Sequence, residues 1–352
     1  MNAKLEKLAQ SLEGELFWSQ LMRTLYATDA SVYKVYPLAV CYPKSTADIQ
    51  QLIRFANEEG VPIIPRAAGT SLAGQCVGEG IVVDVSKHMT EILEFNAEEG
   101  WIRLQPGVIR DELNRFLAPY GWYFGPNTAT ANRCMIGGMV GNNSCGSTSI
   151  VYGSTRDHLL EAEVVLSDGS VAQFGRVSRE DFFEKAKGEK LENKLYKACY
   201  ELLKEEATRA EIKKEYPQPK IRRRNTGYAI DLLSRTNIFE PKGDDFNFCT
   251  LLAGSEGTLA FTTAIKLNLV PLPEKEEAVV AVHFETIRAV MEAVPVIMQQ
   301  HPTACEMMDS IILELSKQNR EQLKNRFFVE GNPRAILMVE FRGKTEAEAL
   351  QK

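Results

Sequence analysis

The stretch that decides the fold of this chain is Pro65-Arg66-Ala67-Ala68-Gly69-Thr70-Ser71-Leu72-Ala73-Gly74-Gln75. It directly follows the apolar residues 61–65, which have strand character, and it contains no acidic side chain. Small residues let a backbone approach a ligand closely, and glycine permits positive φ. Successive backbone N–H groups in such a loop form an anion-binding nest, to which Thr70 and Ser71 add hydroxyl donors and Arg66 adds charge. We therefore expect a phosphate-binding loop rather than an ordinary surface turn.

A second stretch with the same character lies further along the chain. Residues 126–132 and 136–147 are rich in glycine, asparagine and small hydroxyl side chains, and they too lack acidic residues. Two such loops in one domain indicate one extended ligand that contains a polyphosphate. No GxGxxG motif follows a strand, which argues against a Rossmann nicotinamide site. Gly343-Lys344-Thr345 resembles the end of a P-loop, but Met338 occupies the position of the required earlier glycine, so we interpret the triplet as a turn after a strand.

The predicted elements around these loops follow an α/β order. Apolar spacing predicts a helical start over residues 5–26, and residues 124–153 form a long irregular stretch of a kind that is usually functional. Up to residue 174, the predicted strands are 39–43, 61–65, 81–85, 101–106, 160–166 and 171–174, with helices at 48–59 and 110–117. Residues 271–277 are predicted to be a linker, and beyond it strands at 278–284, 304–308 and 335–341 alternate with helices at 286–300 and 310–319.

The composition excludes several classes of protein. The chain has 352 residues, of which 44% are hydrophobic and 25% charged, as in an ordinary globular protein of two or three subdomains. A net charge of −6 argues against a basic nucleic-acid binder. The charged first eleven residues lack the apolar core of a secretion signal, and no apolar run is long enough to cross a bilayer. We therefore expect a cytoplasmic protein. Peripheral attachment to the inner membrane face is compatible with these features. The seven scattered cysteines form no CxxC pair, which predicts reduced thiols and neither a zinc nor an iron–sulfur site.

Taken together in their order and spacing, these motifs resemble the FAD-binding fold of the vanillyl-alcohol oxidase and p-cresol methylhydroxylase (PCMH) flavoproteins. Within it, the chain is most similar to the D-lactate, glycolate and D-2-hydroxyglutarate dehydrogenase branch. The matching segments are residues 65–75, 136–147, 152–153, 161–169, 225–228 and 254–259. The resemblance implies an α+β fold built of α/β elements: a helical segment at 1–35, a PCMH-type FAD-binding domain of two subdomains at 36–272, and a partial ferredoxin-like cap, or substrate domain, at 273–352.

The same resemblance implies the residues that contact FAD. The pyrophosphate would lie on the first loop, the ribityl and adenosine side on the second, adenine at the backbone of Val164, and the isoalloxazine near residues 256–259. The complete predicted set is Pro65, Arg66, Ala67, Ala68, Gly69, Thr70, Ser71, Leu72, Gln75, Pro126, Thr128, Gly137, Gly138, Gly141, Asn142, Asn143, Ser144, Gly146, Ser147, Val164, Glu256, Gly257 and Leu259. Neither loop contains a histidine, and we interpret Cys76 and Cys145 as packing residues, so FAD is expected to be non-covalent.

The implied activity is oxidation of a small D-2-hydroxy acid, such as D-lactate, glycolate or D-2-hydroxyglutarate, by hydride transfer to flavin N5. This chemistry needs an arginine for the substrate carboxylate and a base for the hydroxyl proton. Arg224, Asn225 and Tyr228 are the local candidates for substrate contact, whereas Arg222 and Arg223 fit a solvated charge run. We interpret the four histidines as structural.

We expect this chain to be a fragment of a longer protein. The Asn-Asn-Ser-Cys-Gly form of the second loop is similar to large members of the branch that are fused to an iron–sulfur domain, which this chain is too short to include. The base and metal-ligand histidines of such members lie after the cap, so the catalytic residues are expected beyond Lys352, and no metal site is predicted within the chain.

Three readings of the function stay open at this point. The first is the hydroxy-acid dehydrogenase, with electrons passing to a quinone, a cytochrome or an iron–sulfur domain rather than to NAD. The second is the NADPH-dependent enolpyruvyl sugar-nucleotide reductase of the same fold. The third is a non-catalytic FAD-binding subunit of a multi-subunit oxidase. Fold-level similarity alone does not separate them.

Overall fold

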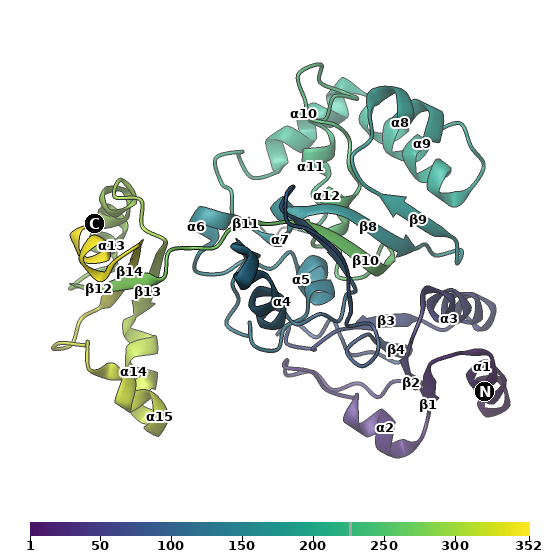
Figure 1. Cartoon of the computed structure of the whole chain (residues 1–352). Coiled ribbons are helices and arrows are strands. Elements are labelled where there is room, and N and C mark those ends of the chain that lie inside the picture. Colours follow the sequence, from purple (N-terminus) through teal and green to yellow (C-terminus); the bar gives the residue numbers. More distant parts are fainter. Residues whose placement is uncertain (225–226) are drawn as a thin grey trace. The chain divides into compact units, whose positions relative to one another are not determined.

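The computed structural model describes residues 1–224 and 227–352 (Figure 1). The chain divides into two compact units. The first contains Met1–Phe124, Thr128–Ser144 and Ser154–Val270, and the second contains Gly125–Asn127, Cys145–Gly153 and Pro271–Lys352. The main division after Val270 lies close to the predicted boundary at 272/273, but two short pieces of the glycine-rich stretch also belong to the second unit.

A small sheet at the start of the first unit carries the first glycine-rich loop. Its strand order is β1-β2-β4-β3, with β3 and β2 parallel to β4 and β1 antiparallel to β2. The strands are β1 (Glu15–Phe17), β2 (Ala39–Tyr42), β3 (Ile63–Arg66) and β4 (Ile81–Asp84), and the helices beside them are α1 (Asn2–Ser11), α2 (Gln20–Leu25) and α3 (Thr46–Glu59). Helix α3 begins where Ser45 accepts the N–H of Asp48 and ends at Gly60, whose φ of 65° is left-handed. Leu52 of α3 and Ile81 of β4 are fully buried in the shared core.

The predicted helical start at residues 5–26 is wrong in its middle, where β1 forms. The apolar spacing continues through Leu12 and Leu16, but Gly14 interrupts it. A Cβ at Gly14 would lie 2.3 Å from the backbone oxygen of Tyr42, so only glycine fits where the extended chain passes β2. The buried carboxylate of Asp48 accepts the N–H groups of Glu13 and Gly14 at 2.8 and 3.0 Å, which fixes this extended path.

A larger antiparallel sheet forms the rest of the first unit, in the order β5-β6-β10-β8-β9. Its strands are β5 (Ile92–Asn96), β6 (Trp101–Leu104), β8 (Leu159–Val165), β9 (Val171–Phe174) and β10 (Phe261–Asn268). Beside them lie α4 (Arg110–Leu117), η1 (Ala118–Tyr120), β7 (Trp122–Tyr123), α5 (Ile136–Asn142), α7 (Thr155–His158), α8 (Arg179–Lys185), α9 (Leu191–Leu203), α10 (Glu206–Glu215), α11 (Ile230–Leu233) and α12 (Cys249–Leu252). The fully buried rings of Phe182 and Phe246 pack edge to face at 4.7 Å in the core of this region.

The second unit contains a three-stranded antiparallel sheet in the order β12-β14-β13. Its elements are α6 (Ser149–Tyr152), β12 (Glu276–Phe284), α13 (Ile287–Met298), β13 (Ala304–Asp309), α14 (Ser310–Gln318), α15 (Arg320–Leu323), η2 (Lys324–Arg326), β14 (Ala335–Gly343) and α16 (Glu346–Gln351), while β11 (Val270–Pro271) spans the division between the units. Val290 of α13 packs on alternate residues of β14, among them Leu337 and Val339. The Gly343-Lys344-Thr345 triplet is a strand-end turn, and Thr345 caps α16. Within the described part of the chain, no helix is both long and apolar enough to cross a membrane.

Candidate functional site

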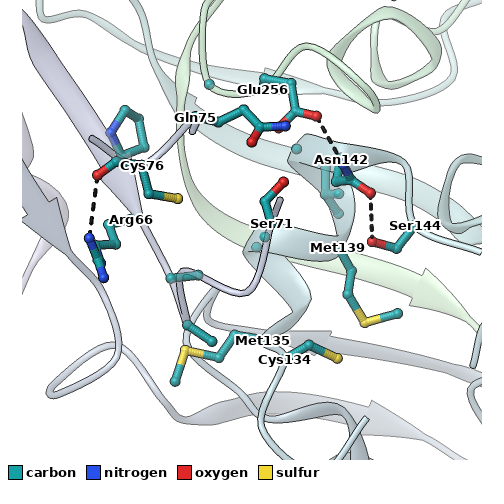
Figure 2. Close-up of a pocket in the computed structure, with 18 of the residues that line it drawn as sticks. Arg66, Ser71, Gln75, Cys76, Cys134, Met135, Met139, Asn142, Ser144 and Glu256 are labelled. Atoms are coloured by element: carbon teal, nitrogen blue, oxygen red, sulfur yellow. Dashed lines mark hydrogen bonds between the residues drawn. The ribbon is translucent and has the colours of Figure 1, made fainter. Parts of the chain in front are cut away.

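A cavity of about 440 Å³ lies within the first unit, and residues of both glycine-rich segments line it (Figure 2). Four stretches line it: the loop after β3, the region that leads into α5 together with α5 itself, the turn after α12, and the start of β10. The predicted cofactor residues that line it are Pro65, Arg66, Ala67, Ala68, Gly69, Thr70, Ser71, Leu72, Gln75, Thr128, Gly137, Gly138, Gly141, Asn142, Ser144, Glu256 and Gly257. Segments almost two hundred residues apart in the sequence therefore meet around one space of the size typical for a cofactor.

The loop after β3 has the backbone of an anion nest. Gly69 has a φ of 63°, and a Cβ at this position would lie 2.9 Å from Nη2 of Arg66. The loop is held from outside by the N–H of Ala30, which donates to the carbonyl of Gly69 at 3.0 Å. Among the described residues, the backbone N–H groups of residues 67–72 have no hydrogen-bond acceptor. These donors are therefore available to an anionic ligand.

Arg66 braces this loop in addition to giving it positive charge. Its Nη1 donates to the carbonyl oxygens of Thr28 at 3.0 Å and Cys76 at 3.4 Å. The guanidinium stacks over the ring of Tyr26 at 5.0 Å, and the hydroxyl of Tyr26 donates to Asp84 at 2.6 Å. Burial and this hydrogen bond raise the pKa of Tyr26 well above its usual value, so the ring under Arg66 stays neutral.

Part of the second glycine-rich segment is a helix where we expected an irregular loop. Residues 136–142 form α5, which ends at Asn143 with a left-handed φ of 52°. Glycine weakens a helix by about 1 kcal/mol relative to alanine, but complete burial of Ile136 and near-complete burial of Met139 compensate here. Gly137 packs on Pro106, where a Cβ would lie 2.5 Å from the proline Cβ. Gly138 faces the cavity, and a Cβ there would lie 3.3 Å from the Cβ of Ala67 on the first loop.

The turn after α12 forms the third wall and is fixed to α5 by backbone hydrogen bonds. The N–H of Gly254 donates to Val140 and that of Glu256 to Gly141, both at 2.9 Å. Glu256 has a φ of 53°, an uncommon conformation for a residue other than glycine. Asn142 donates its side-chain amide to the Glu256 carboxylate at 3.0 Å and thereby supports this conformation. Such outliers often mark functional sites.

Gln75 supplies an acceptor that the described chain leaves unused. Its Oε1 is buried and has no hydrogen-bond partner among the described residues. Figure 2 shows the side chains of Gln75, Glu256 and Asn142 grouped on one side of the cavity. Buried polar atoms are almost always hydrogen-bonded, so this amide indicates a ligand with polar hydrogens, such as hydroxyls, at this place.

Several predicted contacts do not line the cavity. Pro126, Gly146 and Ser147 fall in the second unit. Val164 is buried within β8, where it pairs with Thr262, and Leu259 is 39% exposed next to the lining residues. Asn143 is fully buried and uses its Oδ1 to accept the N–H of Arg156. A direct contact between these six residues and a ligand stays a prediction.

The cavity also has lining residues that are not in the predicted contact set. They are Cys76, Val85, Pro106, Ala129, Thr130, Cys134, Met135, Met139, Val140, Leu252, Ser255, Ala260, Phe261 and Thr262. Five of them, Ala129, Thr130, Met139, Val140 and Ser255, lie within the predicted stretches, and Cys76 directly follows the first loop. Apolar residues such as Leu252 and Phe261 carry no signal that separates them from ordinary core.

The predicted substrate residues lie elsewhere. The side chain of Arg224 is only 11% exposed and forms an ion pair with the buried carboxylate of Asp231 at 2.7 Å, and Arg235 contacts the same carboxylate at 3.2 Å. Tyr228 is 44% exposed, and its hydroxyl lies 2.6 Å from Oγ1 of Thr258. Neither Arg224 nor Tyr228 lines the cavity, and Asn225 lies outside the described residues. Arg224 therefore forms an ion pair outside the cavity lining, and contact of Arg224 or Tyr228 with a substrate stays a prediction.

No histidine is among the described residues that line the cavity, whereas two of the seven cysteines are. His88 contacts Glu15 at 2.8 Å, and His158 is buried with its ring packed on Phe124. All seven cysteines are free thiols. Burial raises the pKa of Cys76 to about 11 and also raises that of Cys134, so both cavity thiols are protonated at neutral pH. The described residues contain no cluster of three or more His, Cys, Asp or Glu side chains suited to a metal ion.

Comparison with known proteins gives two family matches. Residues 37–175 match the FAD binding domain, and residues 273–352 match the C-terminal domain of FAD linked oxidases. The chain is 35% identical over 316 residues to a D-2-hydroxyglutarate dehydrogenase of Haemophilus influenzae, a match that covers 88% of this chain and 30% of the relative. It is 37% identical over 155 residues to the glycolate oxidase subunit GlcD of Bacillus subtilis, covering 44% of this chain and 33% of that protein. The chain thus spans about a third of the length of these curated relatives.

Solved structures support the same architecture. An alkyldihydroxyacetonephosphate synthase structure superposes with a TM-score of 0.63 over 97% of this chain and 56% of that protein, at 16% sequence identity. At this identity the similarity concerns the fold, which is the mixed α/β fold of PCMH-type FAD-binding domains predicted from the sequence.

Proposed function

The chain belongs to the FAD linked oxidases, which combine an FAD binding domain with the oxidase C-terminal domain, and from this premise we propose that it is the flavin-binding part of a dehydrogenase for a small D-2-hydroxy acid. The observation that supports this most is the cavity, where both glycine-rich segments and the turn at Gly254–Gly257 meet. D-2-hydroxyglutarate is the first substrate to test, because the relative from Haemophilus influenzae that is similar over most of this chain is a D-2-hydroxyglutarate dehydrogenase.

The residues of the cavity fit FAD chemically. The free N–H groups of residues 67–72 and the hydroxyls of Thr70 and Ser71 are suited to a pyrophosphate. The unpartnered Oε1 of Gln75 and the carboxylate of Glu256 are acceptors for ribityl hydroxyls. Glu256 is the sole acidic residue among the described lining residues, so only the turn after α12 places a carboxylate that would repel a bound phosphate. When bound, FAD would accept a hydride from the substrate Cα.

Non-covalent attachment is part of the proposal. Covalent flavin requires a nucleophilic side chain at the cavity, and no histidine is among the described lining residues. Cys76 and Cys134 line the cavity, but their raised pKa values leave them as thiols at neutral pH. Acid precipitation should therefore release the flavin into the supernatant.

The residues that bind the substrate carboxylate and take the hydroxyl proton are proposed to lie outside the cavity lining. Arg66 is the sole cationic residue among the described lining residues, and it braces the first loop. Arg224 is paired with Asp231. We propose that the carboxylate anchor and the hydroxyl base come from other parts of the whole protein, and that electrons pass to a quinone, a cytochrome or an iron–sulfur domain. The absence of a GxGxxG motif after a strand supports an acceptor other than NAD.

An anaerobic titration of the flavin-loaded whole protein tests the proposal. D-2-hydroxyglutarate, D-lactate and glycolate are added in turn while the visible flavin absorption is followed, with L-2-hydroxyglutarate and L-lactate as stereochemical controls. Bleaching by one of the first three, with no response to the L enantiomers, is expected. Bleaching by NADPH alone would instead indicate a reductase, and no bleaching by any compound would indicate a non-catalytic flavin subunit.

A further inference from the structure

Arg156 of α7 lies outside the cavity but is bonded to the turn that forms its third wall. Its Nε donates to the carbonyl of Thr250 at 2.9 Å and its Nη2 to the carbonyl of Ala253 at 2.6 Å. Thr250 belongs to the four-residue helix α12 and Ala253 is its C-cap residue, and carbonyls at the end of a helix lack partners within the helix. The rigid fork of a guanidinium therefore sets the direction in which the chain leaves α12.

The backbone of the same residue connects this turn to α5. The N–H of Arg156 donates to Oδ1 of Asn143 at 2.8 Å, and Asn143 is the fully buried residue at which α5 ends. On the other side, the N–H of Gly254 donates to the carbonyl of Val140 in α5 at 2.9 Å. Arg156 thus contacts the ends of both helices that carry cavity residues.

The space around Gly254 shows how tightly the arginine holds the turn. Gly254 has a φ of 88°, and a Cβ there would lie 3.0 Å from Nη2 of Arg156. The next three residues, Ser255, Glu256 and Gly257, all line the cavity. The guanidinium therefore packs against the residue that directly precedes these three, although Arg156 itself does not line the cavity.

Arg156 is a half-buried cation, and burial disfavours its charged form. Burial lowers the pKa of Arg156, and the neighbouring Arg224 acts in the same direction, whereas Asp157 and Asp231 oppose it. No ion pair within 4.0 Å joins Arg156 to a described carboxylate. Its partners are backbone carbonyls, so the arginine is held by the geometry of the turn rather than by a neutralising acid.

We infer that Arg156 is a positioning residue for the flavin, which holds the turn at residues 254–257 against α5 so that Ser255, Glu256 and Gly257 face the ligand. This inference rests on the proposed flavin site, but it does not depend on the hydroxy acid. Arg156 touches no reacting atom, so its loss should change how the flavin is held rather than which substrate is used.

A matched pair of arginines provides the test. Arg179 also donates to two backbone carbonyls, those of Asn237 and Ile238 at 2.6 and 2.8 Å, and it also lies in the first unit. Neither carbonyl belongs to a cavity residue. R156M and R179M each remove two hydrogen bonds to backbone carbonyls, one set beside the cavity and one away from it. Arg179 is exposed and uses Nη1 for both bonds, whereas Arg156 is half-buried and uses Nε and Nη2. R156K and R179K keep the charge but lose the guanidinium fork.

FAD affinity, the spectrum and fluorescence of the bound flavin, and the melting temperature of the apoprotein are measured for each variant. R156M should bind FAD about tenfold more weakly or worse, as expected for lost hydrogen bonds from a charged donor, with an altered flavin spectrum and partial rescue in R156K. R179M should bind FAD with wild-type affinity and spectrum even if its melting temperature falls. If R156M does not fold, the comparison of R156K with R179K takes its place.

Two results would overturn the inference: wild-type affinity and spectrum in the Arg156 variants, or an equal loss of FAD in the Arg179 variants. A wild-type protein that binds FAD but is reduced by no hydroxy acid would refute the proposed function alone. A wild-type protein that takes up no FAD would refute both.

Discussion

A charge placed at Gly138 offers a direct test of the phosphate site. Gly138 lies on α5 and faces the cavity, and the nearest atom to a Cβ at this position is the Ala67 Cβ at 3.3 Å. That distance is tight but requires the first loop to move by only a few tenths of an ångström. Gly138→Asp should therefore be accommodated sterically while it directs a carboxylate into the space assigned to the pyrophosphate.

The expected loss can be estimated from electrostatics. Two unit charges about 4 Å apart repel by about 4 kcal/mol at an effective dielectric constant of 20, and each 1.4 kcal/mol is about tenfold in affinity. Gly138→Asp should thus weaken FAD binding about a thousandfold. The apoprotein should not be destabilised by the charge, because Gly138 is in the first turn of α5, where an acidic side chain is favourable by about 0.3–1 kcal/mol.

Gly138→Asn is the matched control, because it has the same shape without the charge. FAD dissociation constants are measured for wild type and both variants by quenching of flavin fluorescence, together with urea unfolding of the apoproteins. The Asp variant should bind far more weakly than the Asn variant, and the difference should shrink at high salt. Equal affinities for Asp and Asn would refute the assignment of the pyrophosphate to the first loop beside Gly138, and wild-type affinity in the Asp variant would refute the cavity as the FAD site.

Three further predictions concern the stability of the first unit. Gly69→Ala should cost about 1–2 kcal/mol, because alanine resists the φ of 63° and its Cβ would contact Arg66; FAD titration and thermal unfolding should both show a loss, and retention of both would contradict the nest geometry. Asp231→Asn should lower the free energy of unfolding by about 3–5 kcal/mol in urea titrations, because Arg224 and Arg235 lose their buried counter-charge; a change below about 1 kcal/mol would mean that water replaces the carboxylate. Burial raises the pKa of Cys76 from 9.0 to about 11, so the folded state keeps a proton that the unfolded state loses, and wild-type stability should fall between about pH 9 and 11. The fall should be smaller in Cys76→Ser, and parallel curves for the two proteins would show that Cys76 does not contribute.

The sequence predicted the first loop and its surroundings well because the signals there are local. Ser45 and Gly60 delimit α3 by capping chemistry that operates within a few residues. Gly69 has a positive φ, which glycine adopts readily. The lack of acidic residues from 65 to 75 predicts an anionic ligand and does not depend on which other segments pack nearby. The alternating strand at residues 160–166 and its hairpin were likewise found as β8 and β9.

The sequence misled where tertiary contacts override local preference. Three glycines between residues 137 and 141 indicated an irregular loop, yet burial of Ile136 and Met139 produces α5. The spacing of Leu12 and Leu16 indicated a continuous helix, but Asp48 accepts the N–H groups of Glu13 and Gly14 and the chain pairs with β2 instead. Arg224 is a candidate for the substrate carboxylate, but the fold places it outside the cavity lining, in an ion pair with Asp231 seven positions further along.

By itself, the sequence determined the family, the cofactor class and most of the residues that line the cavity. The reason is that the positions of the glycines and the absence of acidic residues can be recognised within short stretches of sequence. Only the tertiary structure decided how those residues meet. It placed the turn at residues 254–257 against α5, left the amide oxygen of Gln75 without a partner beside Glu256, and fixed Arg156 behind that wall. These features depend on contacts between segments that are about a hundred residues or more apart. A short-range sequence pattern does not predict which distant carbonyl accepts a hydrogen bond from a given side chain.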